Sequence, residues 1–253
     1  ESLKVTGYDA LLHLAAQSSG AKSFEIPDID IKINILGTLN MINWCRDNSI
    51  KRILYASSFV VYGDNPNTEI LSEVEACNPK SIYALSKYAS EQLLKIYAEP
   101  LGIQWNALRM FNIYGPGQDL SRNDQGMVSI FLNIVRNNDY VGVQGSLDRF
   151  RDFIYIDDVV QGWERCLYNN EFPNQAYNLG SGVKTTVSSL IDSLIEVYGK
   201  TGKVKVEELG ATPGDIMGCY ADISKISDQL GYVPEFTLEK GIEHFKEWAK
   251  KEA

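Results

Sequence analysis

The sequence predicts an α/β protein built on a parallel sheet. Strand-like and helix-like segments alternate along the chain, and parallel strands need helical crossovers of this kind. We predict a buried strand at 51–56 and a strand at 103–109, on either side of a helix that contains Tyr83 and Lys87. We see no internal repeat and no low-complexity tract that would favour another architecture.

Composition and charge narrow the class of protein. The 253 residues are 44% hydrophobic and 23% charged, as in a soluble globular protein with a sizeable core. A net charge of −9 argues against nucleic-acid or anionic-membrane partners. The four cysteines lack metal-ligand spacing, so we expect reduced thiols and no metal site. No apolar run reaches the length of a membrane span, so we expect a cytoplasmic protein.

The chemically most informative stretch runs from Ser57 to Lys87. Ser58 follows a predicted buried strand, and Tyr83 and Lys87 lie four residues apart, on one face of the next helix. A fixed cation favours the phenolate, so we expect Lys87 to lower the pKa of Tyr83 from its usual value near 10. Such a tyrosine can take a proton from a sugar hydroxyl near neutral pH. A Y-x-x-x-K motif alone is weak, and its conjunction with the serines gives it weight.

These motifs resemble those of a known family. Ser57-Ser58-x-x-Val61-Tyr62-Gly63 followed by Tyr83-x-x-x-Lys87 is similar to the extended short-chain dehydrogenase/reductases, specifically the NAD-dependent nucleotide-sugar epimerases and dehydratases. Ser58 precedes Tyr83 by 25 residues, as the family's catalytic Ser/Thr does, and further matches run from Leu11 to about Asp222. The resemblance implies a Rossmann-like doubly wound sheet that binds NAD, a smaller mixed α/β substrate domain, and catalysis by Ser58, Tyr83 and Lys87, with Ser57 beside the cofactor.

The N-terminal part departs from the family pattern. No G-x-x-G-x-x-G or G-x-G-x-x-G motif follows a strand there, although such glycines admit the cofactor pyrophosphate. Residues 8–16 resemble the family's fourth strand. We therefore expect about 50–60 residues of a family-sized chain to be missing, so that residues 1–115 form an NAD-binding domain without its first βαβ unit. The resemblance implies NAD contacts from Ala15, Ala16, Gln17 and Ser18, whereas His13 is expected to pack in the strand.

Residues 28–48 carry two conflicting patterns. Isoleucines at 29, 31, 33 and 35 alternate as in a strand, whereas apolar residues from 35 to 45 recur at helical spacing. We predict a helix, because the segment is too long for one strand and Asn34-Ile35-Leu36-Gly37-Thr38 resembles the family's N-x-x-G-T helix. The resemblance implies that Asn34 orients the cofactor side, and that helices around 28–48 and 80–99 form a homodimer contact. A buried helix in a monomer would explain the apolar residues equally well.

The chain is expected to enter the substrate domain near residue 116. Residues 109–116 resemble the family's R-x-F-N-x-Y-G-P segment, which implies that Phe111 packs by the nicotinamide and that Asn112 donates to a sugar or phosphate oxygen. As a plain turn former, Asn112 would fit equally. Residues 120–125 predict a loop over the substrate, and 126–137 an amphipathic helix. Residues 116–253 would form mainly the substrate domain, with segments near 145–180 returning to the first.

The remaining matches concern a diphosphate and a sugar. Residues 149–159 resemble the family's R-D-[FY]-[IV] segment, which implies a bidentate diphosphate contact from Arg151; Asp157 and Asp158 are expected to cap the following helix. Asp215 and Cys219 lie in a segment similar to the family's R-x-G-D region, but Thr212 replaces its arginine, so that contact is lost or comes from Arg149. Cys219 lies where the family places a residue beside the sugar 2-substituent, and its small size would admit 2-acetamido sugars. Residues 238–250 predict a surface helix.

Three reactions remain to be weighed. In a 4-epimerase, Tyr83 takes the C4 hydroxyl proton, Ser58 binds the same oxygen, Lys87 binds the nicotinamide ribose, and the sugar passes through a transient 4-keto form. The family's dehydratases carry Asp-Glu where this chain has Phe59 and Val60, which cannot move a proton. A 4-epimerase acting on UDP-Glc/Gal or UDP-GlcNAc/GalNAc is therefore the prediction. An NAD(P)H-dependent 4-ketosugar reductase and a non-catalytic binding protein are the alternatives.

Overall fold

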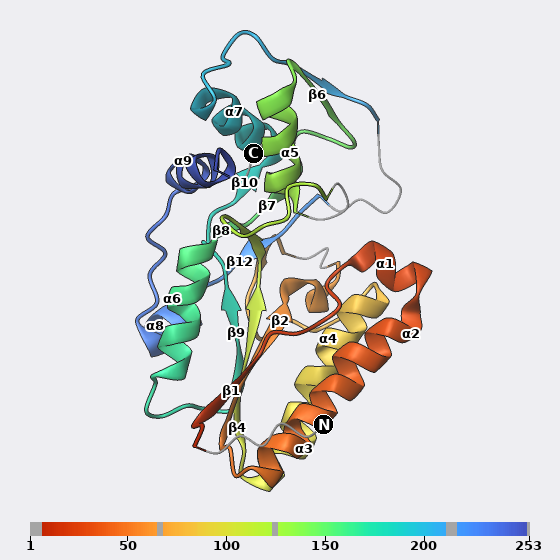
Figure 1. The fold of residues 1–253 in the computed structure, drawn as a ribbon, viewed down its shortest axis with the longest axis vertical. Helices are drawn as coiled ribbons and strands as arrows, with labels where there is room; N and C mark the ends of the chain where they lie inside the picture. The colour runs from red at the N-terminus through yellow and green to blue at the C-terminus, as the bar shows by residue number, and fades with distance from the viewer. Residues whose placement is uncertain (1–6, 65–67, 123–125, 211–216, 252–253) are drawn as a thin grey trace.

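A four-stranded parallel sheet forms the centre of the computed structural model, which describes residues 7–64, 68–122, 126–210 and 217–251 (Figure 1). The strand order is β1-β2-β4-β9, and every neighbouring pair is parallel. This confirms the predicted α/β class with a Rossmann-like sheet. The bounds of the strands are β1 Ala10–His13, β2 Arg52–Ser58, β4 Gln104–Met110 and β9 Gln175–Leu179.

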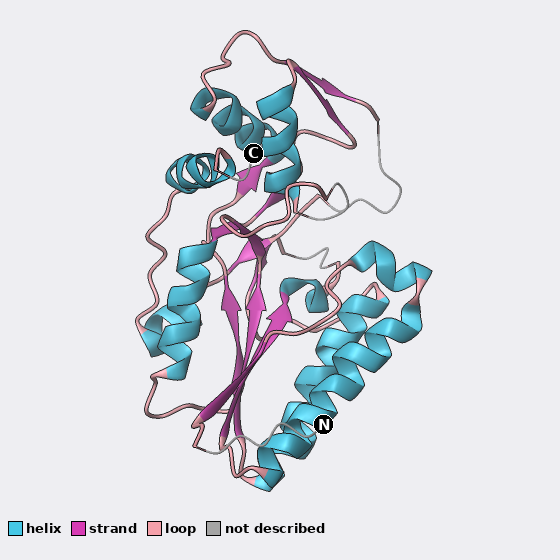
Figure 2. Cartoon of the chain, in the orientation of Figure 1, coloured by secondary structure: helices cyan, strands magenta, loops and turns pink. Residues whose placement is uncertain are grey.

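Helices cover both faces of this sheet (Figure 2). Within β2, Ile53 and Tyr55 belong to the apolar cluster under α3 and the end of the α4 helix, whereas Leu54 and Ala56 belong to the cluster under α6 and α8. Burial on both faces explains why residues 53–56 are all apolar, without polar alternation. The helices are α3 Gly37–Asp47, α4 Ile82–Leu93, α6 Ile156–Leu167 and α8 Ser224–Leu230.

The ambiguous segment 28–48 is helical up to Asp47. After α1 (Gly20–Glu25), α2 (Pro27–Asp30) runs through the π-helical η1 (Ile31–Leu36) into α3. The predicted helix is therefore confirmed. Helix α4 begins where the Ser81 side chain accepts a hydrogen bond from the Ala84 amide, and it continues into η3 (Leu94–Ala98) and η4 (Glu99–Leu101).

Another apolar cluster lies beyond the carboxyl ends of the strands. Helices α5 (Met127–Asn137), α7 (Val187–Val197) and α9 (Leu238–Ala249) pack together there, and Ile242, Phe245 and Ala249 of α9 are buried in it. Four short two-stranded sheets complete the fold: β3 Ile70–Leu71 with β12 Tyr220–Ala221, β5 Asn112–Tyr114 with β8 Phe153–Tyr155, β7 Phe150–Arg151 with β10 Thr185–Thr186, and β6 Tyr140–Val143 with β11 Lys205–Glu208. The β6–β11 pair lies beside α5, at the end of the molecule away from the central sheet (Figure 1).

One predicted detail is wrong. Asp157 and Asp158 lie inside the first turn of α6 and provide no side-chain cap, because the N-cap position falls at Tyr155. The Asp158 carboxylate instead accepts hydrogen bonds from the amides of Glu235 and Phe236, at 2.8 and 3.1 Å. It thereby ties the segment before α9 to α6.

The boundary that we predict near residue 115 remains a prediction, although β9 does rejoin the central sheet beside β4. Across the described ranges, no helix combines the length and apolar character that a membrane crossing requires. The same part of the chain holds no cluster of three or more His, Cys, Asp or Glu side chains suited to a metal ion.

Candidate active site

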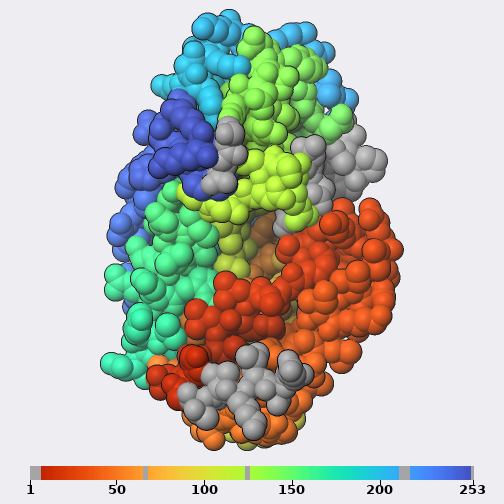
Figure 3. Space-filling view, viewed as in Figure 1, coloured from red at the N-terminus to blue at the C-terminus, as the bar shows by residue number. Residues whose placement is uncertain are grey.

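A cavity of about 700 Å³ opens at the carboxyl ends of the parallel strands, where open α/β sheets bind ligands. The space-filling view shows a hollow between the red-to-orange N-terminal residues and the yellow-green middle of the chain (Figure 3). Four predicted site residues come together in its wall: Ser58 at the end of β2, Tyr83 and Lys87 on α4, and Asn112 after β4. Ser57, Ala16, Ser18 and Phe111 also line it.

Tyr83 and Ser58 meet in this cavity, but the predicted pKa of Tyr83 is wrong. Burial raises the pKa of the Tyr83 hydroxyl above 10.0, and a hydrogen bond with Ser58 opposes the rise without reversing it. The carboxylate of Asp30 adds to the rise. Lys87 lies on the same helical face, but its Nζ is 5.9 Å from the centroid of the Tyr83 ring. Desolvation of the phenol therefore dominates.

Lys87 is itself held in a buried position. Its Nζ donates a hydrogen bond of 2.8 Å to the carbonyl of Ala56 and lies 5.1 Å from the centroid of the Tyr55 ring. Burial lowers the pKa of Lys87 from 10.5 to about 8, and the negative charge of Asp30 opposes this. With a pKa of about 8, Lys87 loses its charge at a lower pH than an ordinary lysine does.

Asn34 acts on the loop after β1 rather than on the cavity. Its Oδ1 accepts from the Gln17 amide at 2.8 Å, and its Nδ2 donates to the Gln17 carbonyl at 3.1 Å. Of the four loop residues predicted to contact NAD, Ala16 and Ser18 line the cavity, whereas the Gln17 side chain donates to Asp30 and Ala15 is exposed. Asn34 therefore positions this loop. His13 is packed as predicted, with its Nε2 3.1 Å from the Thr38 hydroxyl.

Phe111 and Asn112 lie where β4 reaches the cavity. The Phe111 ring stacks on Phe59 with centroids 5.0 Å apart, so this part of the cavity wall is apolar. Asn112 Nδ2 donates a hydrogen bond of 3.0 Å to the backbone carbonyl of Asp152. This bond uses one of the two N–H groups of the Asn112 side chain. The Asp152 carboxylate is buried and accepts from the Ser181, Gly182 and Ala221 amides.

The predicted diphosphate and sugar residues are not gathered with this set. Arg151 and Cys219 lie outside the described lining of the cavity. Arg151 Nη1 donates to the Phe150 carbonyl at 2.7 Å, and Cys219 packs in an apolar cluster with Phe111. Arg149, the possible substitute, donates to the Ser146 carbonyl. Thr212 and Asp215 lie outside the described residues. The roles of Arg151, Asp215 and Cys219 therefore remain predictions.

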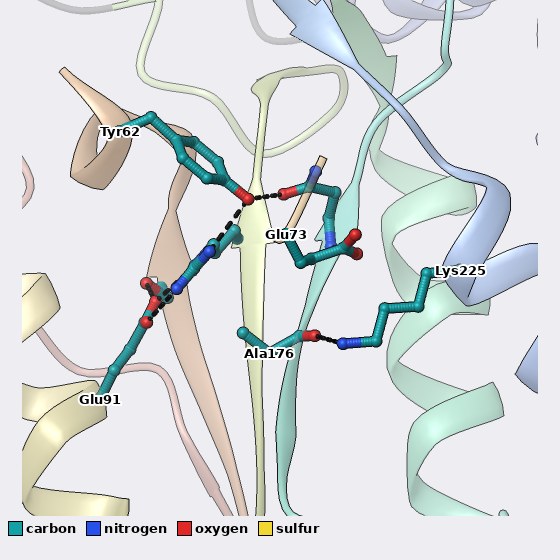
Figure 4. A network of polar contacts seen from close by, with 8 residues as sticks. Tyr62, Glu73, Glu91, Ala176 and Lys225 are labelled. Atoms are coloured by element: carbon teal, nitrogen blue, oxygen red, sulfur yellow. Dashed lines mark hydrogen bonds and ion pairs between the residues drawn. The ribbon is translucent and has the colours of Figure 1, made fainter. Parts of the chain in front are cut away.

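Two features of the site were missed in the sequence. Gln118 lines the cavity, and its Oε1 is buried without a hydrogen-bond partner among the described residues, so it can accept from a ligand. A glutamine in a polar loop gives no sequence signal for this. The second is a buried ion pair behind the site, in which the Glu91 carboxylate accepts from Arg109 and Ser57 (Figure 4). Glu91 lies four residues after Lys87, a spacing that could have suggested it.

Comparison with known proteins places this site in a family. A sequence profile of the NAD dependent epimerase/dehydratase family matches residues 1–180. The chain is 34% identical over 251 residues to a putative UDP-glucose 4-epimerase of Methanocaldococcus jannaschii, covering 99% of this chain and 80% of that protein.

Solved structures agree. The UDP-N-acetylglucosamine 4-epimerase of Methanobrevibacter ruminantium, in complex with UDP-N-acetylmuramic acid, superposes with a TM-score of 0.91 at 30% identity, covering 98% of this chain and 78% of that one. The UDP-glucose 4-epimerase of Thermotoga maritima with UDP-glucose gives 0.88 at 31%, covering 96% and 78%. With its α/β sheet and its Ser58, Tyr83 and Lys87 in one cavity, this chain belongs to the NAD dependent epimerase/dehydratase family.

Proposed function

We propose that this protein is an NAD-dependent epimerase that inverts C4 of a nucleotide-activated hexose. The observation that carries the proposal is the meeting of Ser58, Tyr83 and Lys87 in one cavity at the carboxyl edge of the sheet. The apolar Phe59 and Val60 in the same wall disfavour dehydration, because neither side chain moves a proton. The similarity to 4-epimerases supports the same reaction.

The residues present fit the nicotinamide half of NAD. Small side chains at Ala16 and Ser18 leave room along one wall, Phe111 supplies an apolar surface for a planar ring, and Lys87 carries N–H groups suited to ribose hydroxyls. In this proposal Asn34 and Gln17 hold the wall in place rather than touching the cofactor. When bound, NAD supplies the site that takes hydride from the sugar and gives it back.

The chain's own residues manage the proton. Tyr83 Oη takes the proton of the C4 hydroxyl and returns it after the sugar has rotated within the cavity. The Ser58 hydroxyl bonds the same sugar oxygen and also Tyr83, so it fixes the direction of the transfer. The buried Lys87, whose Nζ is fixed by its hydrogen bond to the Ala56 carbonyl, supplies positive charge beside Tyr83. The enclosing cavity keeps the reacting carbon away from bulk water.

For the substrate we propose a UDP-hexose, with UDP-Glc/Gal and UDP-GlcNAc/GalNAc as the two candidate pairs. Two of the proteins compared above act on sugars of these types by their names. Within this proposal Arg151 and Asp215 belong to the diphosphate side, Asn112 binds a sugar or phosphate oxygen, and Cys219 leaves space for a 2-acetamido group. The buried Gln118 Oε1 would accept from a sugar hydroxyl.

The test uses full-length protein with UDP-GlcNAc or UDP-glucose and no added cofactor, and resolves the sugar products by chromatography. The C4 epimer should form without net absorbance change at 340 nm. Tyr83→Phe should lower turnover by about a thousandfold and leave sugar-nucleotide binding intact, because only the proton acceptor is lost. Tyr168→Phe, on an exposed tyrosine, is the matched control. Turnover within tenfold of wild type in Tyr83→Phe would refute the mechanism. Product only when NAD(P)H and a 4-keto sugar are supplied would establish a reductase.

We also propose a homodimer through the helices around 28–48 and 80–99. Ile33 and Leu36 on η1 and Leu85 on α4 are each 45–48% exposed, although the two helices pack together. A second copy of these helices would cover these side chains. Sedimentation of Leu36→Lys/Leu85→Lys should give a monomer, whereas Val160→Lys, on an exposed valine of α6, should leave the dimer intact. An unchanged sedimentation coefficient in the double variant would exclude this interface.

A further inference from the structure

A row of three polar side chains crosses the central sheet one residue below the catalytic edge. Ser57 of β2, Arg109 of β4 and Asn178 of β9 are register partners on neighbouring parallel strands. All three are at most 7% exposed. The next residue of β2 is Ser58. The row thus lies directly beneath Ser58, and Ser57 itself also lines the cavity.

Helix α4 is bonded to this row through Glu91. Its carboxylate accepts from the Ser57 hydroxyl, from Arg109 Nε at 3.1 Å and from Arg109 Nη2 at 2.7 Å (Figure 4). The side chains of Glu91 and Arg109 are 3% and 8% exposed, so among the ion pairs of the described residues this one alone has both partners buried. Glu91 is four residues beyond Lys87 and eight beyond Tyr83 on the same helix.

The other side of the row is bonded to the turn after β2. Arg109 Nη1 donates to the Tyr62 hydroxyl at 3.0 Å, which donates to Asn178 Oδ1 at 2.6 Å, and Asn178 Nδ2 donates to the Leu71 carbonyl at 2.7 Å. Buried polar groups bonded to one another in this way have one low-energy arrangement. The network therefore fixes β2, β4 and β9 and the turn that carries Phe59 and Val60 relative to one another.

We propose that Glu91 is a positioning residue for the reaction: with Arg109 it holds the Ser57–Ser58 end of β2 against α4, so that Ser58 reaches Tyr83. The Ser57 side chain bonds Glu91 of α4, and Ser58, which bonds Tyr83 of the same helix, follows Ser57 directly. Geometry at this point matters, because a misplacement of about 1 Å lowers turnover by about a hundredfold. The kinetic part of this proposal rests on the proposed epimerase function.

The competing explanation is that the pair serves stability alone. Removing one member of a buried ion pair leaves an unpaired charge, so loss of stability is expected under both explanations and does not distinguish them. The two explanations differ in what happens to the molecules that remain folded. A positioning role lowers kcat in folded protein and leaves KM for the sugar nucleotide near wild type, because the groups that bind the nucleotide lie elsewhere.

The kinetic test uses full-length holoenzyme at a temperature where every variant is folded by circular dichroism. Glu91→Gln should lower kcat about a hundredfold with little change in KM. Ser57→Ala leaves the ion pair in place, so it keeps the proposal testable if Glu91→Gln fails to fold. It should lower kcat in the same direction. The double variant should be no slower than Glu91→Gln, because both changes remove the same link. Leu194→Ala, a buried residue of α7 remote from the row, is the control: it lowers the melting temperature and leaves kcat unchanged.

A second readout is independent of turnover. Ser58 is bonded to Tyr83 and lowers its pKa, while Asp30 from α2 raises it. Tyr55 of β2 interacts electrostatically with Tyr83, and Lys87 Nζ of α4 lies 5.9 Å from the centroid of the Tyr83 ring. In protein with ¹³C-labelled tyrosine, with the Tyr83 signal assigned through Tyr83→Phe, the titration of Tyr83 should move to higher pH in Glu91→Gln and in Ser57→Ala. The Leu194→Ala control should titrate as wild type does.

The outcomes separate cleanly. Lower kcat together with the displaced Tyr83 titration supports the proposal. Wild-type kcat and an unmoved Tyr83 titration in Ser57→Ala, or strictly additive effects in the double variant, would overturn it. If wild-type protein shows no epimerase activity, the proposed function fails, and the Tyr83 titration alone then decides whether Glu91 positions Ser58.

Discussion

Lys87 should reduce the stability of the cofactor-free protein, so replacing it with an uncharged side chain should raise the free energy of unfolding. The side chain is 3% exposed, and burial lowers its pKa from 10.5 to about 8. This difference corresponds to a cost of about 3 kcal/mol for carrying the charged form in the folded state at neutral pH. Lys87→Met removes the charge and also the hydrogen bond to the Ala56 carbonyl, which contributes about 1 kcal/mol. We therefore expect the free energy of unfolding to rise by about 2 kcal/mol at pH 7.

The pH dependence gives the prediction its sign. Between pH 8 and 10.5 the unfolded chain binds a proton at Lys87 that the folded chain has lost, so the stability of the wild type rises with pH through this window. The methionine variant lacks this gain. Its advantage should therefore be largest at pH 7 and should narrow as the pH approaches 10.

Urea unfolding of both proteins at pH 7 and pH 9.5 measures the two differences, and comparing them cancels the titration of groups that the proteins share. Lys95→Met, an exposed lysine of η3, is the matched control and should change stability little at either pH. A methionine variant less stable than wild type at pH 7, or an advantage equal at both pH values, would refute the reasoning. The same variant should lose epimerase activity, so the buried charge is kept for function at the expense of stability.

Three further predictions test other parts of the site. Burial and the charge of Lys87 lower the pKa of His13 from 6.5 to about 4, so the wild type loses stability as the pH falls from 6.5 towards 4. His13→Gln should remove about 2 kcal/mol of that loss at pH 5, as measured by urea unfolding at pH 5 and pH 7. Gly126 has φ +86° and a Cβ there would lie 2.6 Å from Gln118 Nε2, so Gly126→Ala should displace Gln118 and raise KM for the sugar nucleotide about tenfold, whereas an unchanged KM would contradict a role for Gln118 in binding. Cys219→Tyr should impair N-acetylhexosamine substrates more than hexoses in a competition assay, and equal losses on both would exclude the proposed space beside the sugar.

Local patterns were sufficient for the elements of the sheet, and motif spacing was sufficient for the gathering of Ser58, Tyr83 and Lys87 in one cavity. Residues 53–56 of β2 are all apolar because helices cover both faces of the sheet there, and Ser81 caps the helix that places Tyr83 and Lys87 on one face. The buried network could not be predicted in this way. Arg109 is 18 residues from Glu91, and Tyr62 is 116 residues from Asn178. Periodicity reports neighbours along an element, and it carries no information on which buried polar groups pair across the sheet.

The pKa of Tyr83 shows where reasoning from spacing fails. The i, i+4 spacing correctly places a cation on the face of the phenol, but the sign of the pKa change depends on burial, which is a property of the folded chain. The described groups leave the phenol protonated at neutral pH, and Ser58 is the group that opposes this most directly. For the proposed role as a proton acceptor, Tyr83 would need a further positive charge in the cavity to oppose the effect of burial, and the oxidised nicotinamide of NAD would supply one.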